Sequence, residues 1–255
     1  MSTVLVTGGS GVLGGHVVRL LRERGDEVRV LSRRAGRGTH VGDLARGTGV
    51  ADALEGVDRV VHAATDSPTG RSDLRQTENL LFAARSVAHL LYVSIVGIDR
   101  MPYGYYAHKL ACEQAIEGGT APYTILRATQ FHELLERGLR AVGRLPLAPL
   151  PLDWQVQPVA AAEVAQRVAD LVTGEPAGHT DDFAGPEVLD LRRVVETWRA
   201  RHHRPRAVVR IPVPGRLSAA LRSGANTAPG RADGRQTWAQ FVHAQTNHTP
   251  QGAGR

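Results

Sequence analysis

The sequence predicts an α/β protein: a Rossmann-like, doubly wound parallel sheet with a smaller α/β lobe towards the C-terminal end. In the first half of the chain, short β-rich runs alternate with helical stretches, as in sheets whose parallel strands are joined by crossover helices. The first run ends in a glycine-rich turn that leads directly into a helix. Right-handed crossovers would then place helices on both faces of the sheet.

The elements of the first half follow from periodicity. The helix after the first strand carries apolar residues at i, i+4 and i+8 spacing, and Gly25-Asp26 ends it. The predicted strands are Thr3–Thr7, Glu27–Leu31, Asp58–Ala63, Leu90–Val93 and Tyr123–Leu126. The predicted helices are Val12–Arg24 and residues 71–87 and 105–117.

Beyond Arg127 the rhythm becomes irregular. The Pro-rich stretch Arg144–Leu152 predicts neither helix nor strand. The remaining predicted elements are helices over Gln130–Val142, Ala160–Val172 and Leu191–His202 and a strand over Arg206–Ile211.

The composition is that of an ordinary globular protein, with 42% apolar and 22% charged residues. No apolar run approaches the ~18 residues that span a bilayer, so we expect no membrane segment. Cys112 is the single cysteine, and no Cys/His spacing predicts a metal site. We expect a cytoplasmic protein that binds no metal.

The net charge of +6 raises the possibility of a nucleic-acid partner, but the distribution of charge argues against it. The basic residues are scattered over nearly every segment, and aromatic residues make up only 5% of the chain. The densest basic cluster, Arg199–Arg206, is typical of a solvated helix end. We expect no direct nucleic-acid partner, and a homodimer stays open.

The glycine turn carries the strongest functional signal. Glycines at 8, 11 and 14 follow GxxGxxG spacing between a buried strand and an amphipathic helix. Gly8 allows a tight exit from the strand, Gly11 lets backbone N–H groups approach a pyrophosphate, and Gly14 lets helix and sheet pack closely. The helix N-terminus supplies free donors and a partial positive charge for the phosphates. The predicted cofactor-binding residues of this turn are Gly8, Ser10, Gly11, Val12, Leu13 and Gly14.

The end of the second strand predicts which dinucleotide binds. A free ribose 2′-hydroxyl calls for an Asp or Glu here, but the sequence has Ser32, Arg33 and Arg34. Arginine binds a phosphate bidentately. We therefore expect NADP(H) to be preferred over NAD(H).

A tyrosine and a lysine form the candidate catalytic pair. Tyr105 and Lys109 are four residues apart in a helical stretch, hence on one face. Lys109 is the sole lysine among 31 basic residues. Its ammonium could stabilise a phenolate and reach a ribose diol, and in carbonyl reduction the phenol would deliver a proton. Ser94, at the end of a strand, would hydrogen-bond the same substrate oxygen. Tyr106 is the alternative acid.

Taken together, these residues resemble the short-chain dehydrogenase/reductase superfamily, specifically its atypical, NmrA-like branch. The resemblance covers nearly the whole chain. The matching segments are VTGGSGVLG, LSRR, Gly42-Asp43-Leu44, VHAA (61–64), YVSIVGID, YYAHK, Thr124–Leu135 and Phe183–Glu187.

The resemblance implies further site residues. Asp43 and Leu44 would flank the adenine. Residues near the nicotinamide or the substrate would follow the predicted strands Asp58–Ala63 and Tyr123–Leu126. The implied cofactor residues are Ala63, Ala64, Thr65, Ala128 and Thr129, with Lys109 at the ribose and Arg127 nearby. The implied substrate residues are Phe131, His132 and Leu135.

The sequence pattern and the resemblance together predict two domains and a reaction. Residues 1–130 would bind NAD(P), with the sheet completed by segments within 150–175. Residues 131–245 would form an interleaved substrate lobe, and 246–255 a disordered tail. The predicted function is an NADPH-dependent reductase of a small conjugated carbonyl or quinone-like substrate. The alternatives are an NADP(H)-binding redox sensor without catalysis and a sugar-nucleotide epimerase or dehydratase.

Overall fold

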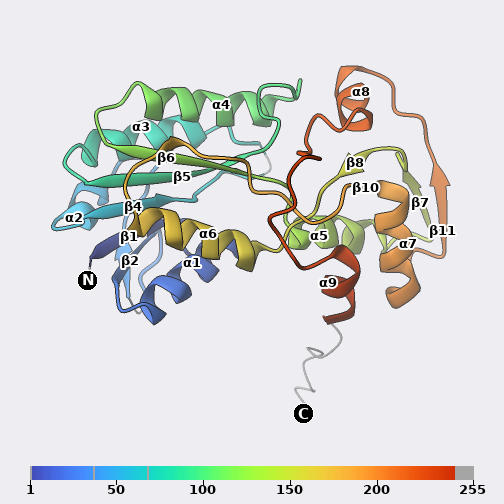
Figure 1. Cartoon of the computed structure of the whole chain (residues 1–255), viewed down its shortest axis with the longest axis horizontal. Coiled ribbons are helices and arrows are strands. Elements are labelled where there is room, and N and C mark those ends of the chain that lie inside the picture. The colour runs from blue at the N-terminus through green and yellow to red at the C-terminus, as the bar shows by residue number, and fades with distance from the viewer. Residues whose placement is uncertain (1, 37, 68, 245–255) are drawn as a thin grey trace, which may run out of the picture.

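The computed structural model describes residues 2–36, 38–67 and 69–244 of the chain. In this part, seven parallel strands form one sheet in the order β3-β2-β1-β4-β5-β6-β9 (Figure 1). The order reverses at β1, which confirms the predicted Rossmann-like sheet. Its strands are β1 (Thr3–Thr7), β2 (Glu27–Ser32), β3 (Thr39–Val41), β4 (Arg59–His62), β5 (His89–Ile95), β6 (Tyr123–Ala128) and β9 (Gly178–His179).

Helices cover both faces of this sheet (Figure 1). Side chains alternate between the faces along each strand, so Val4 and Val6 of β1 point to one face and Leu5 to the other. One face packs against α1 (Val12–Glu23) and α6 (Ala161–Thr173). The other packs against α2 (Val50–Leu54), α3 (Asp73–Ala83) and α4 (Gly104–Glu117).

The rest of the described chain forms the smaller α/β lobe. It holds two two-stranded sheets and a hydrophobic cluster that includes Trp198, Trp238 and Phe241. One sheet pairs β8 with β10 antiparallel, and the other pairs β7 with β11 parallel. The lobe's elements are α5 (His132–Val142), β7 (Leu147–Leu150), β8 (Gln155–Val156), β10 (Leu189–Asp190), α7 (Leu191–His202), β11 (Ala207–Arg210), α8 (Arg216–Arg222) and α9 (Trp238–Ala244).

Two sequence predictions about this half were wrong. Arg144–Leu152 contains the strand β7 despite its prolines, because β7 has a single neighbour. The carbonyls of Pro146 and Leu150 accept from the N–H groups of Ala207 and Ile211. Pro149 is an odd number of residues from both, so its ring nitrogen points away from the pairing. The segment 150–175 does not complete the sheet: α6 lies there and covers a face, while β9 forms the edge. The predicted tail 246–255 lies outside the described residues.

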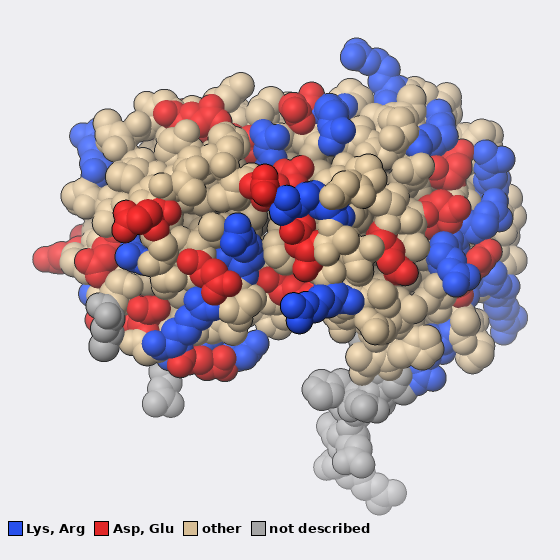
Figure 2. All heavy atoms as spheres, viewed as in Figure 1, with Lys and Arg blue, Asp and Glu red and all other residues tan. Residues whose placement is uncertain are grey.

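Acidic and basic side chains are interspersed over the visible face of the sheet domain (Figure 2). Basic side chains are denser on the side of the lobe that carries α7 and β11. Within the described residues, every helix is too short or too polar to cross a bilayer.

Candidate functional site

The glycine turn between β1 and α1 has the geometry that its spacing predicts. Gly8 has a φ of +71°, and a Cβ there would lie 2.6 Å from the carbonyl oxygen of Ala63. A Cβ on Gly14 would overlap the Gly8 carbonyl oxygen. Glycine is therefore required at both positions, because the turn approaches β4 and α1 packs directly onto the turn.

The start of α1 offers backbone donors to an anion. The Gly11 N–H donates to the Gly8 carbonyl at 2.8 Å, so this donor is already used. The N–H groups of Val12, Leu13 and Gly14, by contrast, follow a cap that has no side-chain hydrogen bond. The first turn of α1 holds no acidic residue. The free donors and the helix dipole fit the phosphates of a dinucleotide.

The other predicted residues of the turn differ in exposure. Ser10 and Gly11 are exposed, and Val12 is 37% exposed. Leu13 is buried in the cluster between α1 and the sheet. Leu13 can therefore contribute its backbone N–H to a ligand, while its side chain packs in the core.

The end of β2 presents two guanidinium groups. Arg33 and Arg34 are exposed, and Ser32 Oγ accepts the Arg34 N–H at 3.1 Å. Among the described residues, no acidic side chain lies within salt-bridge distance of either arginine. This edge can bind a phosphate.

The next loop buries Leu44 and leaves Asp43 partly exposed. The Asp43 carboxylate accepts the N–H groups of Ala45 and Arg46, at 2.9 and 3.3 Å. Leu44 is buried against the core beneath α2 and α3. Oδ1 of Asp43 thus accepts both hydrogen bonds within its own loop, while Oδ2 lies 3.9 Å from Nε of Arg46.

The residues after β4 connect the turn to α4. Ala63 packs against the α1 side of the sheet and Ala64 against the opposite side. Thr65 Oγ1 lies 2.7 Å from a carboxylate oxygen of Asp73 and 3.2 Å from the phenolic oxygen of Tyr105. Thr65 therefore links the fourth strand to both α3 and α4.

Tyr105 is half-buried in the first turn of α4. Burial raises the pKa of its phenol, the contact with Thr65 lowers it, and the Asp73 carboxylate raises it further. The pKa remains above its usual value, so at neutral pH Tyr105 is a protonated donor.

Lys109 lies on the same helix but faces the sheet. Its Nζ donates to the Val93 carbonyl at 3.3 Å and sits 4.3 Å from the centre of the Tyr92 ring. The side chain is buried, and burial lowers the pKa of the ammonium. The predicted pairing of Lys109 with the phenol is not what the structure shows, because the Tyr105 hydroxyl contacts Thr65 instead.

Ser94 points to the face of β5 that α4 covers. Strand alternation puts it on the side of Leu90 and Tyr92, and its Oγ is buried with no partner among the described residues. A buried hydroxyl without a partner is costly, so this group is suited to a ligand oxygen.

The residues at the end of β6 have structural partners. Arg127 donates to both carboxylate oxygens of the buried Glu113, at 3.0 and 2.6 Å. Ala128 is buried in the core, and Thr129 Oγ1 accepts the Gly185 N–H at 3.1 Å. Arg127 thus forms an ion pair that joins the end of β6 to α4.

Three residues at the start of α5 were predicted to face the substrate: Phe131, His132 and Leu135. For His132 the structure corrects this: its ring is fully buried, stacks on Phe241 at 4.8 Å and contacts the Gln236 carbonyl at 3.1 Å. It joins α5 to α9, because the helix turns this face into the lobe. Phe131 packs against the sheet core and Leu135 against the lobe core.

Sequence reasoning missed Asp73. It is 3% exposed, and its carboxylate also accepts the Asp66 N–H at 2.6 Å. An aspartate in a predicted first helical turn is an ordinary start signal, so no pattern distinguished it.

Glu113, Glu117 and His179 bring one ligand atom each within 4.8 Å of one another. Because Arg127 already neutralises Glu113, and Glu117 is paired with His179, we assign no metal to this cluster.

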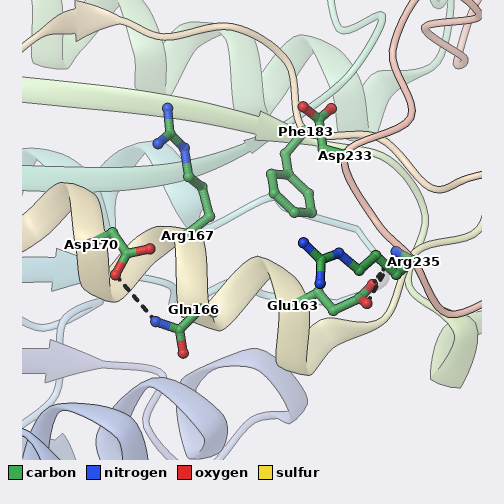
Figure 3. A pocket seen from close by; sticks show the side chains of 7 residues that line it. All are labelled: Glu163, Gln166, Arg167, Asp170, Phe183, Asp233 and Arg235. Atoms are coloured by element: carbon green, nitrogen blue, oxygen red, sulfur yellow. Dashed lines mark hydrogen bonds between the residues drawn. The ribbon is translucent and has the colours of Figure 1, made fainter.

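A surface hollow of about 360 Å³ lies beside α6 (Figure 3). Phe183 occupies its centre, with Arg167 and Arg235 on either side. None of the predicted site residues lines it. The lining residues are Glu163, Gln166, Arg167, Asp170, Phe183, Asp233 and Arg235.

Comparisons with known proteins identify the family of the chain. The chain matches the family described as NAD(P)H-binding over residues 8–174. It is 32% identical over 157 residues to a 3-beta-hydroxysteroid dehydrogenase of Mycolicibacterium neoaurum, a match that covers 52% of this chain and 39% of the relative. It is 28% identical over 196 residues to a 2-alkyl-3-oxoalkanoate reductase of Stenotrophomonas maltophilia, covering 64% and 56%. The chain thus spans about half the length of these relatives or less.

Solved structures share the fold. An NADPH-dependent quinone oxidoreductase of Escherichia coli, complexed with NADPH, superposes with a TM-score of 0.78 at 16% identity, covering 95% of this chain and 99% of that one. A nucleoside-diphosphate-sugar epimerase of Staphylococcus aureus gives 0.78 at 17% identity, covering 94% and 99%. The family match, the glycine turn and the sheet order lead to one conclusion: the chain belongs to the NAD(P)H-binding family.

Proposed function

We propose that the protein is an NADPH-dependent reductase of a small conjugated carbonyl or quinone-like compound. The observation that carries the proposal is the placement of the Tyr105 phenol beside the end of β4, 3.2 Å from Thr65 Oγ1, in an NAD(P)H-binding fold. A neutral phenol is a proton donor, which is what reduction of a carbonyl requires. The oxidoreductase names of the two curated relatives support the reaction class.

NADPH supplies a hydride when bound. Tyr105 would give its proton to the substrate oxygen when the carbonyl carbon receives that hydride, and the carbonyl would become an alcohol. Ser94, with its unpartnered hydroxyl, donates a hydrogen bond to the same oxygen. Lys109 uses one donor on Val93 and has two more for a ribose hydroxyl. Solvent then restores the phenol.

The cofactor preference rests on Arg33 and Arg34. We propose that these exposed guanidinium groups bind the 2′-phosphate of NADPH, since the strand end offers no carboxylate to a ribose diol. A charge-assisted hydrogen bond contributes about 1.5–3 kcal/mol. Replacing both arginines by alanine should weaken NADPH binding at least about tenfold. NADH binding should change little. Titration of all four nicotinamide dinucleotides measures the ratio, and equal loss for NADPH and NADH would contradict the assignment.

The two-part organisation is part of the proposal. Residues 1–130 hold the cofactor, and residues 131–245 shape the substrate side. A small molecule is the expected partner.

Oxidation of NADPH, followed at 340 nm across a panel of quinones and enones, tests the activity. We expect Tyr105→Phe to lower kcat strongly, while the neighbouring Tyr106→Phe serves as the matched control. Absence of turnover across the panel, or an unchanged rate in Tyr105→Phe, would overturn the reductase proposal.

A second function is a sensor that binds NADP(H) without catalysis. It is favoured by the position of Lys109, whose ammonium contacts Val93 and Tyr92 and not the phenol. A sensor requires different affinities for the oxidised and reduced cofactor. Equal affinities, or measurable turnover, would exclude it.

A further inference from the structure

A chain of hydrogen bonds runs from Tyr105 through Thr65 to Asp73. Thr65 Oγ1 lies 3.2 Å from the Tyr105 hydroxyl and 2.7 Å from Asp73 Oδ2. The three residues come from α4, from the end of β4 and from α3. The chain therefore joins three elements at the predicted substrate side of the sheet.

The chemistry of the three groups fixes the direction of this chain. An ionised carboxylate can only accept, so the single hydroxyl hydrogen of Thr65 is directed to Asp73. Thr65 then has lone pairs but no hydrogen for Tyr105. The phenol must be the donor in the remaining bond, and a phenolate could take the Thr65 hydrogen only by withdrawing it from Asp73.

Asp73 is held in place by its own surroundings. It is 3% exposed, its Oδ1 accepts the Asp66 N–H at 2.6 Å, and its backbone carbonyl accepts from Thr77 Oγ1 at 2.9 Å. The two bonds through Thr65 place the carboxylate oxygen within about 6 Å of the phenol, a separation at which a negative charge disfavours a second one. The Thr65 contact lowers the pKa of the phenol only when Thr65 donates to a phenolate, and Asp73 holds the hydrogen that such a bond requires, so the carboxylate opposes that contact and raises the pKa of Tyr105.

We propose that Asp73 is a positioning residue that orients Thr65 as an acceptor and so keeps the Tyr105 phenol protonated until its hydrogen passes to the substrate oxygen. The arrangement favours reduction over oxidation of the substrate, because oxidation needs a phenolate as base. The consequence for turnover rests on the proposed reductase function. The direction of the hydrogen bonds among these three residues does not depend on that function.

Asp73→Asn is the variant that reverses the direction of the hydrogen bonds among Tyr105, Thr65 and residue 73. The introduced carboxamide has one acceptor oxygen, which the Asp66 N–H needs, so its NH₂ group faces Thr65. Thr65 then accepts from the amide, and its hydrogen turns to Tyr105, whose oxygen becomes an acceptor. The side chain at position 73 keeps its size, while its charge is lost and the direction of the hydrogen bonds is reversed.

The test is the titration of the Tyr105 phenol in full-length protein labelled with ¹³Cζ-tyrosine. Tyr105→Phe identifies the resonance among the five tyrosines of the chain. We expect Asp73→Asn to lower the titration midpoint by about one pH unit, a tenfold change in proton affinity. Thr65→Ser keeps the hydroxyl and should keep the wild-type midpoint. Thr65→Val removes the acceptor and should shift the midpoint even if Asp73→Asn does not fold. An unchanged midpoint in both Asp73→Asn and Thr65→Val would overturn the inference.

Turnover supplies a separate measurement. In Asp73→Asn we expect a lower kcat for reduction, an unchanged KM for NADPH and a pH profile displaced to lower pH. In the Tyr105→Phe background the same change should add no further loss, and a full additional loss would refute a role through Tyr105. If the wild-type protein reduces no substrate, the proposed function fails, while the phenol titration still decides the role of Asp73.

Discussion

Gly11 offers a test in which stability and cofactor binding should respond in opposite directions. It caps α1 in an extended conformation, with φ −78° and ψ 174°, which any residue adopts. A Cβ there would meet only the Gly8 carbonyl oxygen, at 3.1 Å. Gly11→Asp should therefore fold, and its carboxylate should accept the N–H groups of the first helical turn. An N-cap Asp exceeds Gly by a few tenths of a kcal/mol, and its charge favours the helix dipole by about 0.3–1 kcal/mol.

The same carboxylate occupies the donors that the phosphates need. Two like unit charges about 4 Å apart near a protein surface repel by about 4 kcal/mol at an effective dielectric constant of about 20. At about 1.4 kcal/mol per factor of ten, affinity for NADPH should fall about a thousandfold. Calorimetric titration with NADPH and thermal unfolding followed by circular dichroism measure the two effects.

Gly11→Asn is the matched control, since it caps the helix without a charge. Its affinity should fall far less than that of the Asp variant. If the Asp variant stays folded and binds NADPH as well as wild type, the phosphates do not rest on α1. If Asn and Asp weaken binding equally, charge is not the cause.

Two further predictions concern stability. Burial lowers the pKa of His132 to about 4. The unfolded chain therefore binds a proton on this imidazole more readily than the folded protein does. The stability present above pH 6.5 is lost as the pH falls towards 4. His132→Phe should reduce the difference in unfolding free energy between pH 7 and pH 5 by about 2 kcal/mol in urea titrations, and an unchanged difference would show that His132 does not titrate this way. Glu113→Gln should destabilise the protein by about 2–3 kcal/mol. This is less than the loss for a fully buried ion pair, because the Arg127 side chain is 22% exposed. The loss of stability should be smaller in the double variant Glu113→Leu with Arg127→Met, which leaves no buried charge without a partner. Equal losses in the single and double variants would show that the ion pair is not responsible.

Most of the sheet could be predicted because its signals are local. Buried strands such as Thr3–Thr7 and amphipathic helices such as α1 carry their periodicity within a few residues. The elements that were missed are short or depend on distant partners. β9 has two residues and exists because it pairs with β6, and β7 is a strand because β11 lies beside it. Neither segment has a pattern of its own.

The site shows the same division. The spacing of Tyr105 and Lys109 predicts a shared helix, but it does not predict what each side chain meets. Lys109 contacts β5, and Tyr105 contacts the end of β4. His132 looked like a pocket residue, and only the docking of α9 shows that its ring is enclosed.

The sequence alone determined the glycine turn between β1 and α1, because the left-handed φ at Gly8 and the close packing at Gly14 require glycine at this spacing. Tertiary structure alone decided the partners of the candidate acid, since Thr65 and Asp73 lie 40 and 32 positions before Tyr105 and meet it only when three elements pack together. Backbone conformation is set by neighbouring residues, whereas side-chain hydrogen bonds depend on which elements the core brings into contact.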